Sequence, residues 1–207
     1  MLKLIKLALG PMQTNCYIVY DELTKEAALF DAACSCSVIL SKLDEVGCKL
    51  KYIIITHAHA DHIGALDELK VKTHAKLCIG KRDRKSLNDN TLSLCSMFGT
   101  QAPTSTCDIE INDGDVLCLG ESKLKFIETP GHTPGGISTY FDNKLISGDT
   151  LFFESVGRWD FPGGDAKLLM ESIKNKLFTL PDLTEVYPGH GESTTIGHEK
   201  LNNMLVI

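Results

Sequence analysis

The side chains best suited to chemistry lie close together in one short stretch of the sequence. Three histidines and one aspartate fall within six consecutive positions: His57, His59, Asp61 and His62. A single histidine is usually an ordinary surface or core residue. Neutral imidazoles and carboxylates at this density, however, are the ligands that zinc, iron and manganese accept. The stretch therefore predicts a metal site.

Three further candidate ligands lie downstream, and each directly follows a glycine: His132, Asp149 and His190. Glycine allows backbone turns that other residues avoid, so a ligand beside it can be directed toward a point where several strands meet. Five of the seven histidines belong to this pattern. His74 and His198 lack such a context, and we expect both to be surface residues.

The elements that position these ligands are predicted to alternate between short strands and helices. A β-branched run predicts a strand over 52–56, directly before the histidine cluster, and we expect Asp61 and His62 to open the next helix. Apolar spacing over 38–46 predicts a helix that ends at Gly47. Other strands are predicted over 1–9, 17–20, 27–31, 76–79, 108–111, 116–119, 124–128, 137–141, 144–147 and 185–187, and other helices over 64–70, 82–98 and 166–179.

This order of elements predicts the fold class. Two β-rich halves, each followed by helices, favour an α/β architecture in which two sheets pack together with helices on the outer faces. Periodicity alone leaves a doubly wound sheet open. The chain has 207 residues without a low-complexity linker, so we expect a single domain over 1–207.

Composition excludes several classes of protein. With 43% hydrophobic residues and a net charge of −6, the chain is neither disordered nor fibrous. Its acidic balance argues against nucleic-acid or anionic-membrane partners, and the basic run 81–85 is interpreted as a solvated helix face. Lys3 and Lys6 interrupt the apolar start, which disfavours a secretory signal. We expect a cytoplasmic protein, with its oligomeric state left open.

The eight cysteines do not predict a disulfide framework, because the chain is neither small nor visibly exported. Most of them lie in apolar segments, where a thiol behaves as a small hydrophobic group. Cys34 and Cys36 form the one close pair. A redox or metal role for that pair stays open.

The ordered ligand pattern resembles the metallo-β-lactamase superfamily. The H-x-H-x-D-H run and the later histidines and aspartate occur in the family's order, and the segment 14–17 (Thr-Asn-Cys-Tyr) resembles the family's second strand. The resemblance covers essentially the whole chain and implies an αββα sandwich with metals at one edge of the two sheets. It implies two ligand sets with a bridging carboxylate between them: His57, His59 and His132; Asp61, His62 and His190; and Asp149.

This ligand set implies hydrolytic chemistry. Two metals about 3.5–4 Å apart share a water whose pKa falls toward about 7, and either cation polarises a substrate carbonyl. No serine or cysteine nucleophile is then needed. The carboxylates of Asp61 and Asp149 are thereby expected to be catalytic as well as metal-binding. Two divalent ions are expected, zinc first, with iron and manganese also suited to these ligands.

Within the superfamily, the chain most resembles the compact glyoxalase II-like hydrolases, which cleave thioesters. We therefore expect a thioesterase similar to hydroxyacylglutathione hydrolases, acting on a small-molecule thioester or ester. Full-length glyoxalase II enzymes carry a C-terminal glutathione-binding domain, whereas 17 residues follow His190 here, so glutathione specificity stays open. Secreted β-lactamases resemble the chain less, because many carry a cysteine at the position of Asp149.

Two other functions remain as alternatives. Mononuclear iron persulfide dioxygenases share the histidine run and a segment like 157–161 (Gly-Arg-Trp-Asp-Phe). Gly189 favours the hydrolase, because those dioxygenases usually place alanine before the last histidine. A non-catalytic metal-binding protein is the third candidate, but structural zinc sites are usually closed, whereas seven ligands for two metals leave open positions.

Arg158 is the candidate substrate-binding residue outside the metal ligands. It lies where glyoxalase II enzymes carry a basic substrate-binding residue, although Asp160 replaces their tyrosine. A planar guanidinium suits the carboxylate of an anionic substrate. The alternative is a structural arginine paired with Asp160 or Asp165.

Overall fold

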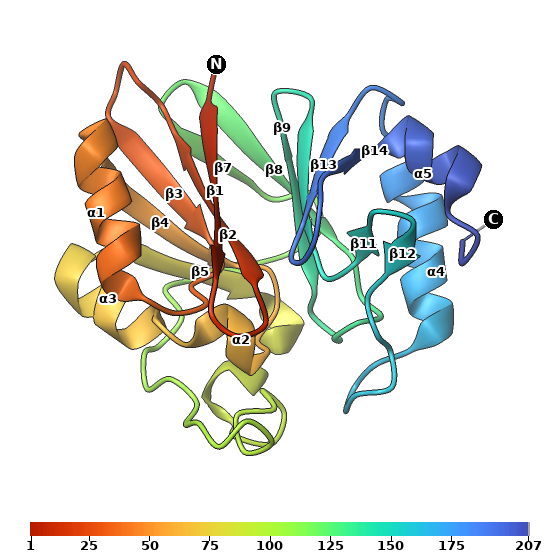
Figure 1. Ribbon diagram of the computed structural model, residues 1–207, viewed down its shortest axis with the longest axis horizontal. Coiled ribbons are helices and arrows are strands. Elements are labelled where there is room, and N and C mark those ends of the chain that lie inside the picture. Colours follow the sequence, from red (N-terminus) through yellow and green to blue (C-terminus); the bar gives the residue numbers. More distant parts are fainter. Residues whose placement is uncertain (207) are drawn as a thin grey trace.

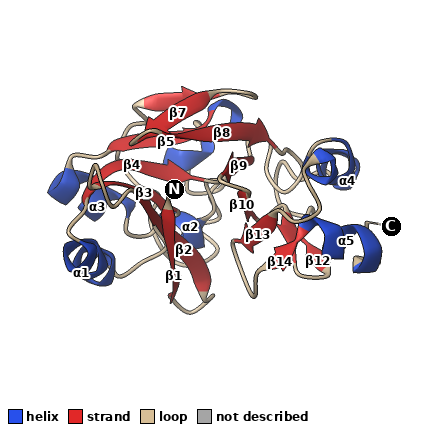
Figure 2. Cartoon of the chain, turned by 90° about the horizontal axis from the view of Figure 1, so that it is seen from above, coloured by secondary structure: helices blue, strands red, loops and turns tan. Residues whose placement is uncertain are grey.

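Two six-stranded mixed sheets pack against each other, and helices cover the outer face of each (Figures 1 and 2). The computed structural model describes residues 1–206. The strand order is β1-β2-β3-β4-β5-β6 in the first sheet and β14-β13-β10-β9-β8-β7 in the second. The predicted αββα sandwich is thereby confirmed, and the doubly wound sheet is excluded.

The strands divide at the middle of the chain, so each half builds one six-stranded sheet, and two short strands of the second half form a separate two-stranded sheet. The strands are β1 (Lys3–Leu9), β2 (Thr14–Tyr20), β3 (Glu26–Phe30), β4 (Lys49–Ile55), β5 (Lys76–Gly80), β6 (Ile109–Ile111), β7 (Val116–Leu119), β8 (Ser122–Glu128), β9 (Ile137–Phe141), β10 (Lys144–Gly148), β11 (Leu151–Phe152), β12 (Ser155–Val156), β13 (Glu185–Pro188) and β14 (Thr194–Thr195). The helices are α1 (Cys36–Val46), α2 (Ala60–Ile63), α3 (Leu66–Thr73), α4 (Ala166–Asn175) and α5 (Ile196–Asn202), with 3₁₀ turns at Lys81–Asp83, Ser86–Asn88 and Leu177–Thr179.

Alternation along the strands builds the layers of the core. In β4, Ile53 and Ile55 belong to the cluster that includes Ile39 of α1 and Leu66 of α3. Ile54 points the other way, into the cluster between the two sheets. Because successive side chains of a strand face opposite sides, one buried apolar run serves two layers. A third cluster joins the second sheet to α4 and α5.

The predicted helix over 82–98 is wrong. The region contains two 3₁₀ turns followed by hydrogen-bonded turns. Its polar side chains form hydrogen bonds with backbone groups that a helix would otherwise use. The Asp89 carboxylate accepts hydrogen bonds from the backbone N–H groups of Thr91 and Leu92, at 2.8 and 2.9 Å. Asp83, inside the run interpreted as a solvated face, is fully buried.

Other helix predictions differ mainly at their ends. The helix ending at Gly47 is confirmed, with Gly47 in the left-handed conformation and its N–H bonded to the last turn. The helix predicted over 64–70 lies at Leu66–Thr73 as α3, and the one over 166–179 is α4 followed by a 3₁₀ turn. The short α5 was not predicted.

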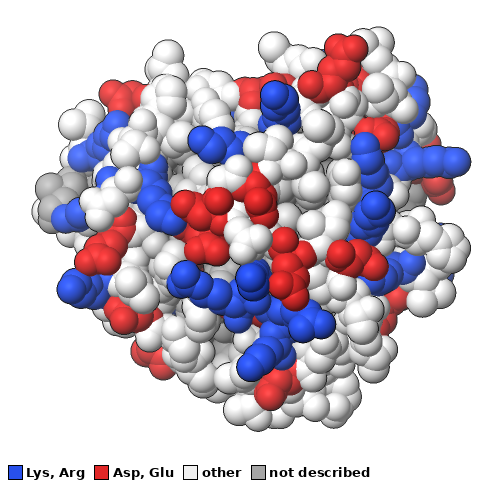
Figure 3. Space-filling model, turned by 180° about the vertical axis from the view of Figure 1, so that it is seen from behind, with Lys and Arg blue, Asp and Glu red and all other residues white. Residues whose placement is uncertain are grey.

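Charged side chains are distributed over both halves. Lys and Arg lie directly beside Asp and Glu on the face shown in Figure 3. Within the basic run 81–85, Arg82 pairs with Glu128 and Arg84 with Glu110, at 3.7 and 3.0 Å. Among residues 1–206, no helix combines the length and apolar character needed to cross a membrane.

Candidate metal centre

The first sheet contributes four of the predicted ligands through one loop. His57 and His59 follow the end of β4, and Asp61 and His62 lie in the short helix α2, as expected. His59 directly precedes α2 and has extended backbone angles. The chain therefore leaves the strand, presents two imidazoles, and then turns into a helix that presents the next two ligands.

The second sheet contributes the other three from separate loops. His132 follows β8, Asp149 directly follows β10, and His190 follows β13. Strands β10 and β13 are parallel, so their carboxyl ends lie at the same edge. The N–H of Ile137 donates to the carbonyl of Thr56 at 2.9 Å and links the two sheets at this edge.

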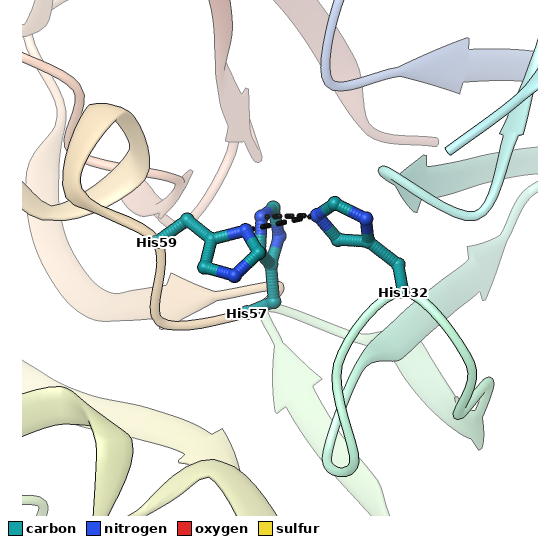
Figure 4. A group of neighbouring side chains, drawn as sticks. All are labelled: His57, His59 and His132. Atoms are coloured by element: carbon teal, nitrogen blue, oxygen red, sulfur yellow. Dashed lines mark hydrogen bonds between the residues drawn. The ribbon is translucent and has the colours of Figure 1, made fainter. Parts of the chain in front are cut away.

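Three imidazoles form the first ligand group (Figure 4). The Nε2 atom of His132 lies 3.2 Å from Nε2 of His57 and 2.9 Å from Nδ1 of His59. Figure 4 shows the two rings from the β4 loop and the ring of His132 directing nitrogens toward one point between the sheets. Ligand atoms about 3.3 Å apart are what tetrahedral zinc requires with bonds of about 2.0–2.1 Å.

A second group lies beside it and consists of Asp61, His62 and His190. The Oδ2 atom of Asp61 is 3.4 Å from Nε2 of His62 and 3.2 Å from Nε2 of His190. Thr14 donates to the same oxygen at 2.9 Å and holds the carboxylate in place. This group combines two imidazoles with a carboxylate, which is also a set that zinc, iron and manganese accept.

Asp149 lies between the two groups. Its Oδ2 is 3.6 Å from Nε2 of His132 and 3.5 Å from Nε2 of His190. Its Oδ1 is 3.5 Å from Nε2 of His62. One carboxylate therefore faces both ligand groups, which is the arrangement a bridging ligand needs.

Hydrogen bonds on the far side of three rings, those of His62, His132 and His190, select the nitrogen that faces the site, whereas Nε2 of His59 is buried without a partner. The Nδ1–H of His62 donates to Asp31 at 2.8 Å, and that of His132 to the carbonyl of Arg158 at 2.6 Å. The Nδ1–H of His190 donates to the carbonyl of Met12 at 3.2 Å. Each bond directs Nε2 inward, as outer hydrogen bonds do for histidine ligands of metals.

Burial and charge act differently on the two ligand groups: the first group favours neutral imidazoles, and the second favours a charged one. Burial, together with the neighbouring imidazoles, lowers the pKa of His59 to about 3 and that of His57 well below its usual value. Burial also lowers the pKa of His62, but Asp31, Asp61 and Asp149 outweigh it and raise that pKa to about 10. The carboxylates thus favour positive charge at the second group.

Unpartnered buried atoms show that these residues fit a metal. Nε2 of His62 and Oδ1 of Asp149 are buried without a hydrogen-bond partner. Both atoms face the space between the ligand groups, 3.5 Å apart. Buried polar atoms are nearly always partnered in folded proteins, so two orphans here indicate that a cation completes the site.

Sequence reasoning missed the residue that orients the centre from behind. The Asp31 carboxylate accepts bonds from the backbone N–H and hydroxyl of Thr56 at 2.8 and 2.9 Å, as well as from His62. It thereby joins the end of β3 to the loop after β4. The available signal was a carboxylate at the end of a predicted buried strand.

The segment 14–17 holds the loop of the last histidine. The side-chain amide of Asn15 and the hydroxyl of Tyr17 both donate to the carbonyl of Pro188, at 2.9 and 2.7 Å. The backbone N–H of Asn15 donates to the carbonyl of Gly189 at 2.7 Å. The segment noted for its family resemblance therefore acts by positioning His190.

Arg158 lies near the centre but is engaged by another side chain. Its guanidinium donates two hydrogen bonds to Asp160, at 2.9 and 2.7 Å, and lies over the ring of Phe161. The bond to Asp160 raises the pKa of Arg158 and lowers that of Asp160. Asp165 instead caps α4. The pairing with Asp160 is thus the one observed.

The remaining candidates lie outside the ligand groups. His74 is exposed, and His198 is half-buried and bonded to Glu154 at 2.9 Å. All eight cysteines are free thiols. Within residues 1–206, neither Cys34 nor Cys36 joins a cluster of metal-ligating atoms.

Sequence comparison agrees with this geometry. Residues 9–190 match the model of the metallo-beta-lactamase superfamily. The hydroxyacylglutathione hydrolase GloC of Haemophilus influenzae is 33% identical over 195 residues, covering 92% of this chain and 92% of that protein.

Solved structures with a similar fold also include proteins of this superfamily. BLEG-1, a B3 metallo-beta-lactamase, is similar with a TM-score of 0.94 and 36% identity, covering 99% of both chains. TTHA1623, solved in a di-iron-bound form, is similar with a TM-score of 0.85 and 32% identity, covering 97% of this chain and 98% of that one. ETHE1 from Myxococcus xanthus is similar with a TM-score of 0.84 and 30% identity, covering 98% of this chain and 83% of that one. With this ligand arrangement, this fold and a match across most of its length, the chain belongs to the metallo-beta-lactamase superfamily.

Proposed function

We propose that this protein is a metal-dependent thioesterase that hydrolyses a small-molecule thioester or ester with two divalent cations, zinc being the expected metal. The position of Asp149 between two complete ligand groups carries the proposal. The similarity to GloC supports a thioester substrate, and the di-iron-bound relative supports a site for two metals.

The chain itself supplies orientation and charge. Two divalent cations in such a site lower the pKa of a shared water and polarise a carbonyl oxygen. Asp31 and the Arg158 carbonyl fix the rings of His62 and His132, so the ligand nitrogens are placed before substrate arrives. The carboxylates of Asp61 and Asp149 supply the negative charge that two dications require. We therefore propose these two as the catalytic carboxylates.

Gly189 supports the use of both ligand groups. A Cβ at this position would overlap Oδ1 of Asp149 and lie 2.9 Å from Cε1 of His62. An alanine would therefore displace the carboxylate that lies between the groups. The glycine keeps Asp149 in reach of His62, and this favours a two-metal hydrolase over a one-metal enzyme.

A mononuclear iron persulfide dioxygenase is the second candidate. The group of His57, His59 and His132 is by itself a complete set of three nitrogen ligands, which leaves positions open on a single iron. The segment 157–161 carries the resemblance to those enzymes and lies at this group, because the Arg158 carbonyl binds His132.

Thiol release without oxygen, measured beside the metal content, tests the proposal. The metal-loaded enzyme is given S-lactoylglutathione, glutathione persulfide and a β-lactam in parallel. We expect thiol release from the thioester under anaerobic conditions and close to two metals per chain. Oxygen consumption with the persulfide and one iron per chain would establish the dioxygenase instead, and cleavage of the β-lactam alone would establish a lactamase.

A further inference from the structure

A cavity of about 560 Å³ opens directly beside the second ligand group. Its walls come from the turn between β1 and β2, the residues after β3, helix α2 and the segment 95–101. Figure 1 shows the segment that follows β5 running below α2 and the β1–β2 turn. Asp61 and Thr14 belong to the wall, so the cavity reaches the metal centre itself. Its volume lies within the range of roughly 300–1,000 Å³ of small-molecule sites.

The lining is apolar and lacks positive charge. None of the side chains around the cavity is Lys, Arg or His, and Asp61 is its one carboxylate. Apolar walls include Leu9, Ile63 and Phe98. Phe98 and Met12 remain 45% and 51% exposed, so the cavity leaves apolar surface that an apolar ligand would cover. A carboxylate at the far end of an acyl chain, away from the metal centre, would lose water without gaining a cationic side chain as a partner.

The charged pair of Arg158 and Asp160 lies beside the first ligand group and does not line the cavity. The Arg158 carbonyl binds His132 of the first ligand group, and its guanidinium faces solvent with Asp160. The cavity instead adjoins Asp61 of the second group. A thioester carbonyl placed between the two groups would therefore have Arg158 beside one group and the apolar cavity beside the other.

We propose that this cavity binds the uncharged apolar acyl chain of the substrate, while the thiol part extends toward Arg158. The assignment rests on the proposed thioesterase function and specifies its substrate class. Acyl chains of several carbons are preferred over acetyl, because each buried methylene removes apolar surface from water. Acyl chains that end in a carboxylate are disfavoured.

A series of thioesters that share one neutral thiol, N-acetylcysteamine, tests the assignment. With the metal-loaded enzyme, kcat/KM is expected to rise about fourfold per methylene from acetyl through butyryl to hexanoyl. The succinyl thioester is expected to fall at least tenfold below butyryl. Equal kcat/KM across the series, or a preference for succinyl, would overturn the proposal.

Two variants on one segment locate the effect. Thr100 lines the cavity and its side chain is exposed at the rim, so Thr100→Trp is expected to fill the space and abolish the dependence on chain length. Met97 is 65% exposed on the same segment but does not line the cavity, so Met97→Trp is expected to keep that dependence. Loss of the dependence in both variants, or in neither, contradicts the assignment.

Non-cleavable thioethers separate the cavity from the reaction. Ethyl and hexyl thioethers of N-acetylcysteamine lack the carbonyl, and calorimetry measures their binding to the metal-loaded enzyme. Tighter binding of the hexyl compound without cleavage of any thioester would leave the cavity assignment standing and reject the hydrolase. Cleavage of thioesters with equal binding of both thioethers would reject the cavity and retain the hydrolase.

Discussion

Asp149 is the residue on which both ligand groups depend, because its two oxygens lie 3.5–3.6 Å from ligand nitrogens of each. Asp149→Asn keeps the shape but removes the charge that two dications need. We expect thioester turnover to fall by about 100-fold or more, and metal content to fall below two per chain. Circular dichroism should stay unchanged because the core is untouched. Asp182→Asn, far from the centre and exposed, is the matched control; equal turnover in both variants would refute a bridging role.

Gly189 controls the space beside that carboxylate. Gly189→Ala adds a methyl group where Oδ1 of Asp149 lies, so we expect the carboxylate to move and the second metal to be lost first. Elemental analysis should then give close to one metal per chain, with hydrolysis strongly reduced. Two metals and normal turnover in the alanine variant would show that the site tolerates the displacement.

Asp160 competes with an anionic substrate for the Arg158 guanidinium. Arg158→Ala is expected to raise KM for S-lactoylglutathione severalfold with kcat little changed, because the guanidinium lies at the rim and not among the ligands. Asp160→Asn frees the guanidinium and is expected to lower the same KM. The matched measurement uses an N-acetylcysteamine thioester, which has no carboxylate. A fall in melting temperature without a change in either KM would identify a purely structural pair.

At the scale of elements, the turn after β5 holds the loop of His132. The buried Asp83 carboxylate accepts bonds from the hydroxyl of Thr133 and the N–H of Gly135, both at 2.6 Å. These bonds tie the turn that replaced the predicted helix to the loop that aims His132. The turn therefore acts on the metal centre without contacting it.

Asp83→Asn places an amide N–H against the Thr133 hydroxyl or the Gly135 N–H and so loses one of the two hydrogen bonds. We therefore expect the loop that holds His132 to become more mobile. Metal affinity, measured by competition with a chelator, is expected to fall about 10- to 100-fold, as when other supporting partners of ligands are lost. Thr133→Val removes one of the two bonds and should give a smaller loss. Excess metal should restore turnover in both variants. Unchanged metal affinity with lowered thermal stability would limit Asp83 to a structural role.

At the scale of the whole molecule, the metal centre joins the two sheets. The first sheet supplies His57, His59, Asp61 and His62, and the second supplies His132, Asp149 and His190. A cation held here would be coordinated by side chains of both sheets. Bound metal is therefore expected to stabilise the contact between the two halves.

Chelation tests that contribution. A free metal concentration about 100-fold above Kd stabilises a protein by about 2.7 kcal/mol per site, which corresponds to about 5–10 °C in Tm for a chain of this size. We expect removal of metal to lower Tm by at least this amount in scanning calorimetry, and readdition to restore it. An unchanged Tm would show that the core layers alone hold the sheets together.

Residue types and local patterns were enough to predict which side chains gather at the centre and where most strands lie, whereas periodicity left a doubly wound sheet open. The seven candidate ligands were identified from residue type, because histidines and aspartates this close to strand ends and glycines have few other uses. The strands followed from local patterns, because the run of apolar residues in β4 depends only on neighbours in the chain.

Features that depend on residues distant in the chain appear only in the folded protein. Asp31 and Asp83 are ordinary carboxylates in the sequence, and only the folded chain brings them to His62 and to Thr133. Residues 82–98 have helical spacing, yet the bonds that Asp83 and Asp89 make to backbone groups and to other loops outweigh that local preference. The apolar cavity likewise arises from four separate segments. Hydrogen bonds and cavities between remote segments form only once the sheets have packed. They therefore leave no periodic signal in the sequence.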